Sequence, residues 1–314
     1  MNPINQIILE GPDLSGKTTL YQQIHNLTDY RWNIQDRSSL SMLVYAKLYG
    51  RSQFTHIESL KSELYNLNNF MILLLPDWDI IAKRFEVRGD SIQNLISLKK
   101  LYNVFLEAAK EFESFPNVYV IRKEVDDFIL NNLITDMVKF ENNSFANISK
   151  MFLYHNLANK DFESVGLSLT SFEYGEFDDI SLEDLNYETE KKYYQTIKES
   201  LLKTIDNEFN GLNEYSRKED KMSRRFIYTS NTCISLAHFL FRDNVLDCKF
   251  FIRSSNTRDI LKYDLNFIKY LSKCVKEKLS LKENTPVKLN VTVNSAHIPV
   301  NISEAKEEEI ESKD

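Results

Sequence analysis

The chain has 314 residues, long enough for two hydrophobic cores, and its hydrophobic content of 42% can fill both. Its formal net charge of −7 argues against a general nucleic-acid-binding protein. The most concentrated apolar run, residues 70–75, is too short to span a bilayer, and no basic residue precedes the short apolar run at the N-terminus. Cys233, Cys248 and Cys274 lack the paired spacing of a disulfide framework or a zinc site. We therefore expect a reduced, cytoplasmic protein that neither spans a membrane nor is secreted.

The first motif along the chain is a phosphate-binding loop. Residues 7–9 form a short apolar strand, residues 11–18 read GPDLSGKT, and a helix begins near Lys17. The GxxxxGK[ST] pattern requires this order, because the loop amides and the helix N-terminus then surround phosphate oxygens. Lys17 can reach the β- and γ-phosphates of ATP, and the Thr18 hydroxyl can ligate Mg²⁺. The motif predicts these cofactor-binding residues: Gly11, Asp13, Ser15, Gly16, Lys17, Thr18 and Thr19.

A second predicted strand, residues 32–34, runs into Asp36 and Arg37. Strand ends on the P-loop side are where an α/β fold places its chemistry. Asp36 can hold Mg²⁺ through water or accept the proton of an acceptor hydroxyl, and Arg37 can neutralise an acceptor phosphate. The alternative is an ordinary helix N-terminus, in which Ser38 or Ser39 is the cap and Asp36 interacts with the helix dipole.

Two arginines follow the third predicted strand, residues 70–75. Arg84 and Arg88 are four positions apart on a predicted helix, so they share one face and can both point at a phosphate chain. The alternative is a solvated basic face. The remaining predicted elements of this half are a helix at 91–112, a strand at 118–121 and a helix at 125–140. Strands that alternate with helices predict a parallel sheet flanked by helices, an α/β domain over residues 1–142.

Residues 5–140 resemble thymidylate kinase and its relatives among the P-loop nucleoside monophosphate kinases. The resemblance lies in GPDLSGKTT, in DRS after the second strand and in LLLPDWDIIAKRFEVRGD. It implies that Lys17 and Thr18 bind ATP and Mg²⁺, and that Asp36 and Arg37 face the acceptor. It also implies that Arg84 and Arg88 are lid arginines. The predicted catalytic residues are Lys17, Asp36, Arg37, Arg84 and Arg88, and the predicted metal ligands are Thr18 and Asp36.

The α/β pattern ends near residues 141–144. Beyond it we predict a helix at 188–209, three consecutive strands and a helix at 265–279, which indicates an α+β domain over residues 145–302. The strands are predicted at 226–229, 233–241 and 246–252, with a hairpin turn at 242–244. Residues 303–314 are acidic and predicted to be a frayed tail.

Residues 233–270 resemble the thymidylate synthase and deoxycytidylate hydroxymethylase family. Cys233 matches the nucleophile, Arg253 and Ser254 match an arginine–serine pair twenty residues later, and Asp264 stands at the base-reading position. An ionised Asp accepts but cannot donate, so Asp264 favours cytosine. The resemblance further implies a homodimer, in which two arginines reach the partner's nucleotide phosphate. The remaining predicted nucleotide-site residues are Arg224, Arg225, Asn256 and His297.

The alternative for Cys233 is a buried strand thiol in a degenerate domain. The family's general acid and folate region are not identifiable before Arg224. Because such groups act as a unit with the nucleophile, we expect the second domain to bind a pyrimidine nucleotide weakly or not at all, without methylating it.

Together the two halves predict an ATP-dependent kinase for a (deoxy)nucleoside monophosphate, with a pyrimidine base, fused to a thymidylate-synthase-like domain. Such a fusion suggests, by analogy, a bacteriophage protein of nucleotide metabolism. Two alternatives remain open. One is a kinase for a hydroxymethylated pyrimidine in a base-modification pathway, and the other is a non-catalytic nucleotide-binding protein with a regulatory or host-interaction role.

Overall fold

The computed structural model describes residues 3–89, 93–143, 163–173, 188–210 and 223–298. These residues divide at Asn143 into two compact units, and each is described by itself. The predicted acidic tail, residues 303–314, lies outside the described residues, as do residues 145–162 at the start of the second predicted domain. Within the described residues, no helix is long and apolar enough to cross a membrane.

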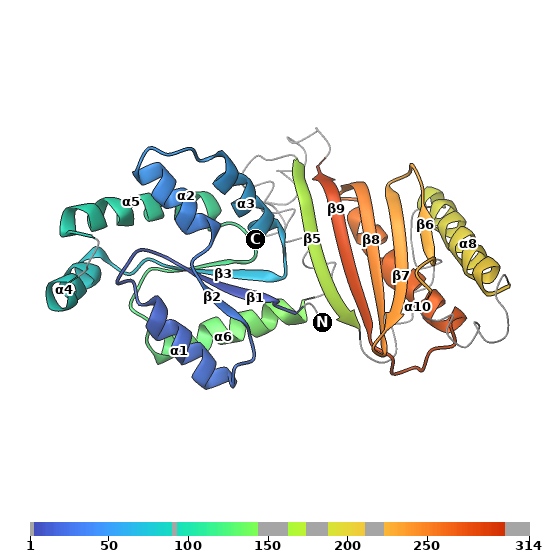
Figure 1. Ribbon diagram of the computed structural model, residues 1–314, viewed down its shortest axis with the longest axis horizontal. Coiled ribbons are helices and arrows are strands. Elements are labelled where there is room, and N and C mark those ends of the chain that lie inside the picture. The colour runs from blue at the N-terminus through green and yellow to red at the C-terminus, as the bar shows by residue number, and fades with distance from the viewer. Residues whose placement is uncertain (1–2, 90–92, 144–162, 174–187, 211–222, 299–314) are drawn as a thin grey trace, which may run out of the picture. The chain divides into compact units, whose positions relative to one another are not determined.

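A parallel sheet forms the centre of the first unit (Figure 1). Its strands are β1 (Gln6–Glu10), β2 (Ile34–Asp36), β3 (Asn69–Leu74) and β4 (Val118–Ile121), in the spatial order β2-β1-β3-β4. β1 and β3 are buried along nearly their whole length. Continuous burial is typical of a central parallel strand that is covered on both faces, and it explains why these two strands read as unbroken apolar runs.

Helices cover both faces of this sheet. Figure 1 shows α1 (Lys17–Thr28) and α6 (Asp127–Asn142) on one face, with α2 (Ser39–Leu48), α3 (Phe54–Tyr65) and α5 (Leu95–Phe112) on the other. The predicted parallel sheet flanked by helices is therefore confirmed. The sequence did not predict α3, and it gave the start of α2 only as the alternative for residues 36–39, since α2 is apolar around most of its circumference and shows no single hydrophobic stripe. α5 begins later than predicted because Asn94 and Ser97 form a reciprocal capping box.

The second strand, Ile34–Asp36, begins and ends two residues later than the predicted range of 32–34. The Trp32 side chain is buried, and its indole N–H donates to Glu141 before the strand begins. Ile34–Asp36 instead pair with residues 7–9 of β1, in the register Leu9 to Asp36. Asp36 is thus the last residue of the strand, next to the end of β1.

Glu141, near the end of α6, accepts hydrogen bonds from the segments that precede β1 and β2. Its carboxylate is 4% exposed and accepts from the Ile4 amide at 3.0 Å, the Trp32 indole at 2.9 Å and the Arg31 guanidinium at 2.6 Å. These bonds fix the starts of β1 and β2 against the last helix. A buried carboxylate is stable only with such partners.

The second unit is a five-stranded mixed sheet with the order β5-β9-β8-β7-β6. The strands are β5 (Glu163–Glu173), β6 (Ile227–Thr229), β7 (Ile234–Arg242), β8 (Val245–Asn256) and β9 (Val287–His297). Only β8 and β9 pair in parallel; the other neighbours are antiparallel. The predicted hairpin between β7 and β8 is confirmed. Its two loop residues, Asp243 and Asn244, have φ angles of 47° and 60°, as a tight primed turn requires.

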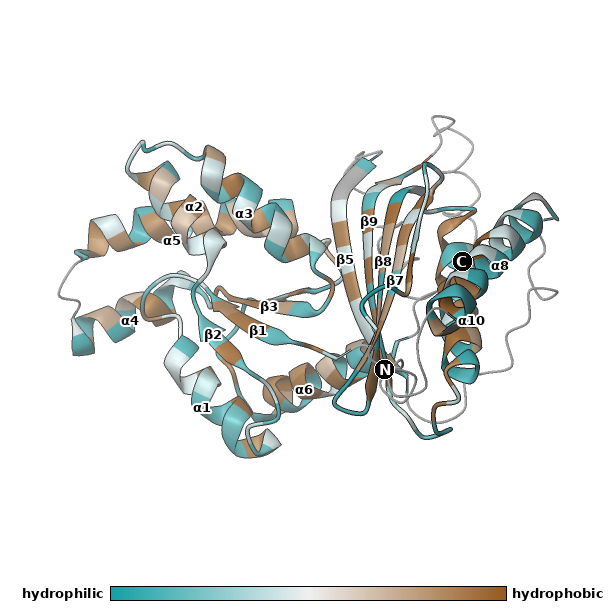
Figure 2. Ribbon diagram, turned by 45° about the vertical axis from the view of Figure 1, so that its right-hand side comes forward, coloured by the Kyte–Doolittle hydropathy of each residue, from teal (hydrophilic) through white to brown (hydrophobic). Residues whose placement is uncertain are grey.

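Two helices, α8 (Glu188–Asn210) and α10 (Leu261–Lys278), lie on one face of this sheet in both views (Figures 1 and 2). Hydrophobic and hydrophilic residues alternate along the strands (Figure 2). In β8, Cys248, Phe250 and Ile252 are buried, whereas Lys249 and Phe251 between them are exposed. Since neighbouring strand residues point to opposite faces, one face of the sheet packs on the helices and the other carries the exposed side chains. β5 and β9 were not predicted, because their pairing joins residues more than a hundred positions apart.

Candidate active site

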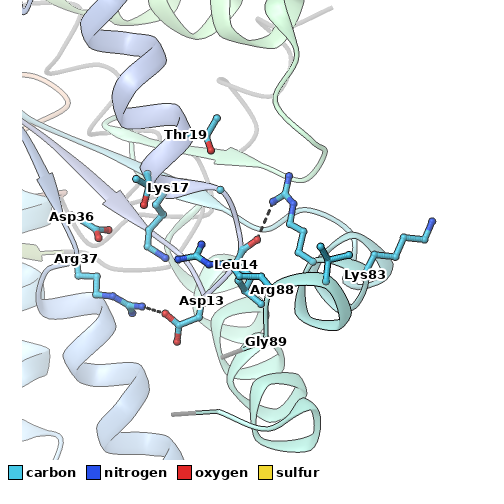
Figure 3. A pocket seen from close by; sticks show the side chains of 13 residues that line it. Asp13, Leu14, Lys17, Thr19, Asp36, Arg37, Lys83, Arg88 and Gly89 are labelled. Atoms are coloured by element: carbon cyan, nitrogen blue, oxygen red, sulfur yellow. Dashed lines mark hydrogen bonds and ion pairs between the residues drawn. The ribbon is translucent and has the colours of Figure 1, made fainter. Parts of the chain in front are cut away.

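A pocket of about 960 Å³ opens beyond the carboxyl ends of β1 and β2 (Figure 3). Open α/β sheets bind their ligands at this edge. The pocket collects the P-loop, the residues after β2 and one face of α4 (Trp78–Arg88). Its lining residues are Asp13, Leu14, Gly16, Lys17, Thr18, Thr19, Asp36, Arg37, Lys83, Arg84, Val87, Arg88 and Gly89.

The P-loop backbone can take its shape only with glycine at two positions. Gly11 and Gly16 have φ angles of 136° and 107°, which side-chain-bearing residues rarely adopt. A Cβ atom at Gly11 would lie 2.4 Å from the Leu74 carbonyl oxygen of β3. The loop therefore packs directly against the neighbouring strand. α1 begins at Lys17 without a side-chain cap, which leaves its first amides available to an anion.

Lys17 lies at the floor of this loop. Its ammonium donates to the carbonyl oxygens of Gly11 and Pro12, at 2.8 Å each, and the residue is 7% exposed. Burial, with a smaller contribution from the nearby Arg37, lowers the pKa of Lys17 to about 8. The Ser15 hydroxyl is also buried, and it has no hydrogen-bond partner in the part of the chain that the structure describes. Both side chains suit an incoming phosphate.

The Arg37 guanidinium forms an ion pair with Asp13 of the P-loop (Figure 3). The Tyr45 hydroxyl donates to the other carboxylate oxygen of Asp13 at 3.2 Å. Burial acts to lower the pKa of Arg37, but Asp13 and Tyr45 outweigh it and the pKa is raised. The guanidinium therefore stays charged. Its Nη1 atom is buried without a partner among the described residues.

The residues after β2 combine the two roles that were predicted as alternatives. Asp36 and Arg37 both line the pocket, and α2 begins directly after them, with Ser38 at the N-cap position. The Ser38 hydroxyl does not cap the helix; it donates to Glu10 at 2.9 Å. Residues 36–38 are therefore both a pocket wall and a helix start.

The two arginines of α4 reach the same pocket as Lys17. Arg84 donates to the Leu14 carbonyl of the P-loop at 2.9 Å and to Glu124 at 2.5 Å, so it links the P-loop to the segment after β4. Arg88 extends from α4 into the pocket (Figure 3). Arg84 is thus engaged at the P-loop, not turned outward on a solvated helix face.

The pocket is basic although the chain as a whole is acidic. Its lining includes five cationic side chains but only two carboxylates. Such a concentration of positive charge around a P-loop attracts a polyanion. The cations are Lys17, Arg37, Lys83, Arg84 and Arg88, and the carboxylates are Asp13 and Asp36.

In the second unit, the structure places Cys233 and Arg253 side by side. The Arg253 amide donates to the Cys233 carbonyl oxygen at 2.7 Å, and its guanidinium donates to the Asn231 carbonyl oxygen at 2.9 Å. Cys233 is exposed and immediately precedes β7, so the alternative of a buried strand thiol is wrong. The predicted strand at 233–241 accordingly begins one residue later, at Ile234.

The other predicted residues of this unit are spread over several elements. Ser254 and Asn256 pair with Ser295 and His297 in the register of β8 and β9. Arg224 and Arg225 are exposed before β6, and Arg225 lies 3.6 Å from Glu208 of α8.

Asp264 does not stand where a base could be read. It lies in the first turn of α10, is 1% exposed, and accepts from the Tyr194 hydroxyl at 2.8 Å and the Ser255 hydroxyl at 2.7 Å. Both carboxylate oxygens are therefore used inside the core, and the predicted contact with cytosine is wrong for this structure. The spacing from Cys233 suggested the role, but only packing shows that α10 turns this side chain inward. Burial raises the pKa of Asp264 to about 6.

No family model matches the sequence, and no curated protein matches it. Solved structures do match. Deoxyadenosine kinase from M. mycoides, with the products dCMP and a flexible dCDP bound, is 16% identical with a TM-score of 0.32, over 43% of this chain and 98% of that one. The same kinase with bound dCTP is 14% identical with a TM-score of 0.32, over the same shares.

Thymidylate synthase from T4 phage is 18% identical with a TM-score of 0.26, over 34% of this chain. The chain spans only 37% of the length of that synthase. The similar structures thus include a deoxyadenosine kinase and a thymidylate synthase.

Replacing Asp264 by Asn is expected to stabilise the second unit at neutral pH. The folded-state pKa of about 6 lies above the ordinary value of 3.8, so the folded protein binds more protons than the unfolded chain and its stability falls as pH rises from 4 through 6. Asn accepts from Tyr194 and donates to Ser255 without a charge, which should recover about 2–3 kcal/mol above pH 7. Urea unfolding of the full chain at pH 4.5 and 7.5 measures this. Equal destabilisation at both pH values would show that the core needs the carboxylate.

Proposed function

We propose that the first unit transfers a phosphoryl group from ATP, with Mg²⁺, to a (deoxy)nucleoside monophosphate with a pyrimidine base. The observation that carries the proposal is the P-loop pocket, in which side chains from the P-loop, the end of β2 and α4 meet. Phosphoryl transfer needs positioning and charge neutralisation more than covalent chemistry, and these residue types supply both.

On the donor side, the α1 amides and Lys17 would bind the ATP phosphates. Lys17 would exchange its bonds to the Gly11 and Pro12 carbonyl oxygens for phosphate oxygens. The polyanion would also keep the lysine protonated, because a nearby negative charge favours the ammonium form. Arg84 and Arg88 would stabilise the negative charge of the transferring group.

The Thr18 hydroxyl and the Asp36 carboxylate would hold Mg²⁺. Both line the same pocket, and Mg²⁺ prefers oxygen ligands, with one or two from the protein and the others from water and phosphate. Within the described residues, no group of three or more His, Cys, Asp or Glu side chains is placed to hold a metal. When bound, Mg²⁺ supplies charge neutralisation at the phosphate oxygens.

On the acceptor side, Arg37 would bind the acceptor phosphate, whose oxygen attacks the transferring phosphoryl group, and Asp36 would face the acceptor while it holds Mg²⁺. Arg37 has a buried Nη1 atom with no partner in the described structure, which leaves this donor for a ligand. Asp13, which pairs with Arg37, would then be released or shared.

For the second unit we propose a thymidylate-synthase-like nucleotide-binding domain of phage type that also forms a homodimer. The exposed thiol of Cys233 beside Arg253 supports a remnant nucleotide site. Ile227 and Phe251 are exposed on the sheet face that points away from the buried side chains of β8, which supports self-association there.

Replacing Lys17 by Ala should lower acceptor-dependent ADP release at least about 100-fold, because this ammonium acts on charge that grows during transfer. ADP release from ATP is measured with a panel of deoxynucleoside monophosphates, including hydroxymethylated pyrimidines. Lys17→Met preserves most of the buried apolar stem and should lose activity to the same extent. A variant that keeps most of its kcat would contradict the proposal, as would a wild-type protein that binds ATP but transfers to no acceptor.

Arg84→Ala and Arg88→Ala should each lower kcat more than ATP affinity, by about 10-fold or more. Steady-state kinetics with the best acceptor, combined with ATP titration, separate the two effects. Arg122→Ala is the matched control, since Arg122 follows β4 and pairs with Glu113 outside the pocket lining. If all three variants behave alike, the α4 arginines have no part in the transfer.

The protein is expected to be a homodimer at micromolar concentration. Phe251→Glu introduces a charge on the exposed sheet face and should give monomers in sedimentation velocity. Phe128→Glu is the matched control, because Phe128 is 73% exposed but belongs to the first unit. A wild-type monomer, or a dimer that only the Phe128 variant dissociates, would contradict this interface.

A further inference from the structure

Glu10 is a buried carboxylate that the proposed chemistry leaves unused. It is the last residue of β1, directly before the P-loop glycine, and it is fully buried. Four donors converge on it. They are the amides of Ser38 at 2.6 Å and Ser41 at 3.1 Å, the Ser38 hydroxyl at 2.9 Å, and the Ser41 hydroxyl. Burial raises the pKa of Glu10, and the four hydrogen bonds oppose this by favouring its charged form.

These donors belong to Ser38, the N-cap residue of α2, and to Ser41 in its first turn. The helix begins after Ser38, whose own side chain makes no cap bond. Glu10 of β1 supplies the missing cap, because its carboxylate accepts hydrogen bonds from the amides of Ser38 and Ser41. A carboxylate at this end also interacts favourably with the helix dipole. Glu10 thus holds the α2 N-terminus at Ser38 and Ser41, while Glu63 of α3 accepts from Ser39 between them.

The residue before this turn has an unusual backbone. Arg37 has a φ angle of 65°, in the left-handed region that a long side chain seldom adopts. Such a conformation persists where the surroundings fix it. Here the amides of Arg37 and Ser38 are fixed by hydrogen bonds to Leu9 and Glu10, the last two residues of β1. The Arg37 amide donates to the Leu9 carbonyl oxygen at 2.9 Å, and the Ser38 amide donates to Glu10.

We propose that Glu10 is a positioning residue, which holds the turn at residues 36–38 so that Asp36 and Arg37 face the acceptor beside the ATP site. The inference rests on the proposed function. Glu10 is bonded covalently to Gly11 of the P-loop and through hydrogen bonds to the acceptor-side turn. Glu10 therefore joins the P-loop to the acceptor-side turn, together with the Arg37–Asp13 ion pair and the bond from the Arg37 amide to Leu9.

Glu141 provides a matched comparison in the same unit. It is also a buried carboxylate, and neither carboxylate lines the pocket. The donors to Glu141 come from Ile4, Arg31 and Trp32, whereas those to Glu10 come from Ser38 and Ser41, directly after the pocket residues Asp36 and Arg37. Neutralising either carboxylate should weaken the fold to a similar degree, since each leaves several donors poorly paired. Only the change at Glu10 should act on the acceptor.

The experiment compares Glu10→Gln with Glu141→Gln in the full chain. We expect both to lower the melting temperature. Glu10→Gln alone should reduce kcat/KM for the acceptor by about 100-fold, the scale of a 1 Å misplacement, while ATP affinity changes by less than about 3-fold. Equal kinetic effects of the two variants would overturn the proposal, and so would a parallel loss of ATP affinity in Glu10→Gln.

Amide hydrogen exchange gives a second readout that does not need turnover. In Glu10→Gln, the amides of residues 37–41 should exchange at least about 10-fold faster, while those of α1 stay protected. If wild-type protein transfers phosphate to no acceptor, the proposed function fails, and the exchange result still decides whether Glu10 holds this turn. Unchanged exchange at residues 37–41 would overturn the positioning role.

Discussion

The pocket of the first unit depends on hydrogen bonds to the residues at the end of β1. β1 is paired on both sides, so its polar groups become available only where the strand stops. There, three consecutive residues accept hydrogen bonds. The Leu9 carbonyl accepts from the Arg37 amide, the Glu10 carboxylate from the Ser38 amide at the start of α2, and the Gly11 carbonyl from the Lys17 ammonium. Gly11 must be glycine because a Cβ atom there would lie 2.4 Å from the carbonyl oxygen of Leu74, at the end of β3. Hydrogen bonds to three consecutive residues thus hold the turn at residues 36–38 and the Lys17 side chain at the same edge of the sheet.

The electrostatics of the pocket differ from those of the chain. The chain as a whole has a formal net charge of −7, whereas the arginines and lysines at the P-loop create a local positive field. Protein carbonyls and carboxylates pair with three of these cations. Lys17 is bonded to Gly11 and Pro12, Arg37 to Asp13, and Arg84 to Leu14 and Glu124.

Asp264 in the second unit shows that sequence spacing alone does not determine where a side chain points. Asp264 stands at the predicted distance from Cys233, yet it forms a core contact with Tyr194 and Ser255. Tyr194 stacks on Phe267 at a centroid distance of 4.3 Å, so an aromatic core surrounds the carboxylate. Burial of this kind removes a side chain from ligand contact as completely as a substitution would. Cys233, by contrast, is exposed beside Arg253.

From the sequence alone, local patterns predicted the P-loop, the four parallel strands, the α4 arginines and the hairpin at Asp243 and Asn244. Each of these rests on short-range chemistry, such as strand period, glycine conformation or helix spacing. The tertiary structure alone decided the rest. It brought β5 against β9 across the second unit, placed Glu10 under the α2 N-terminus and turned Asp264 into the core. These features depend on contacts between residues far apart in the chain, and no local pattern encodes which buried carboxylate will meet which donors.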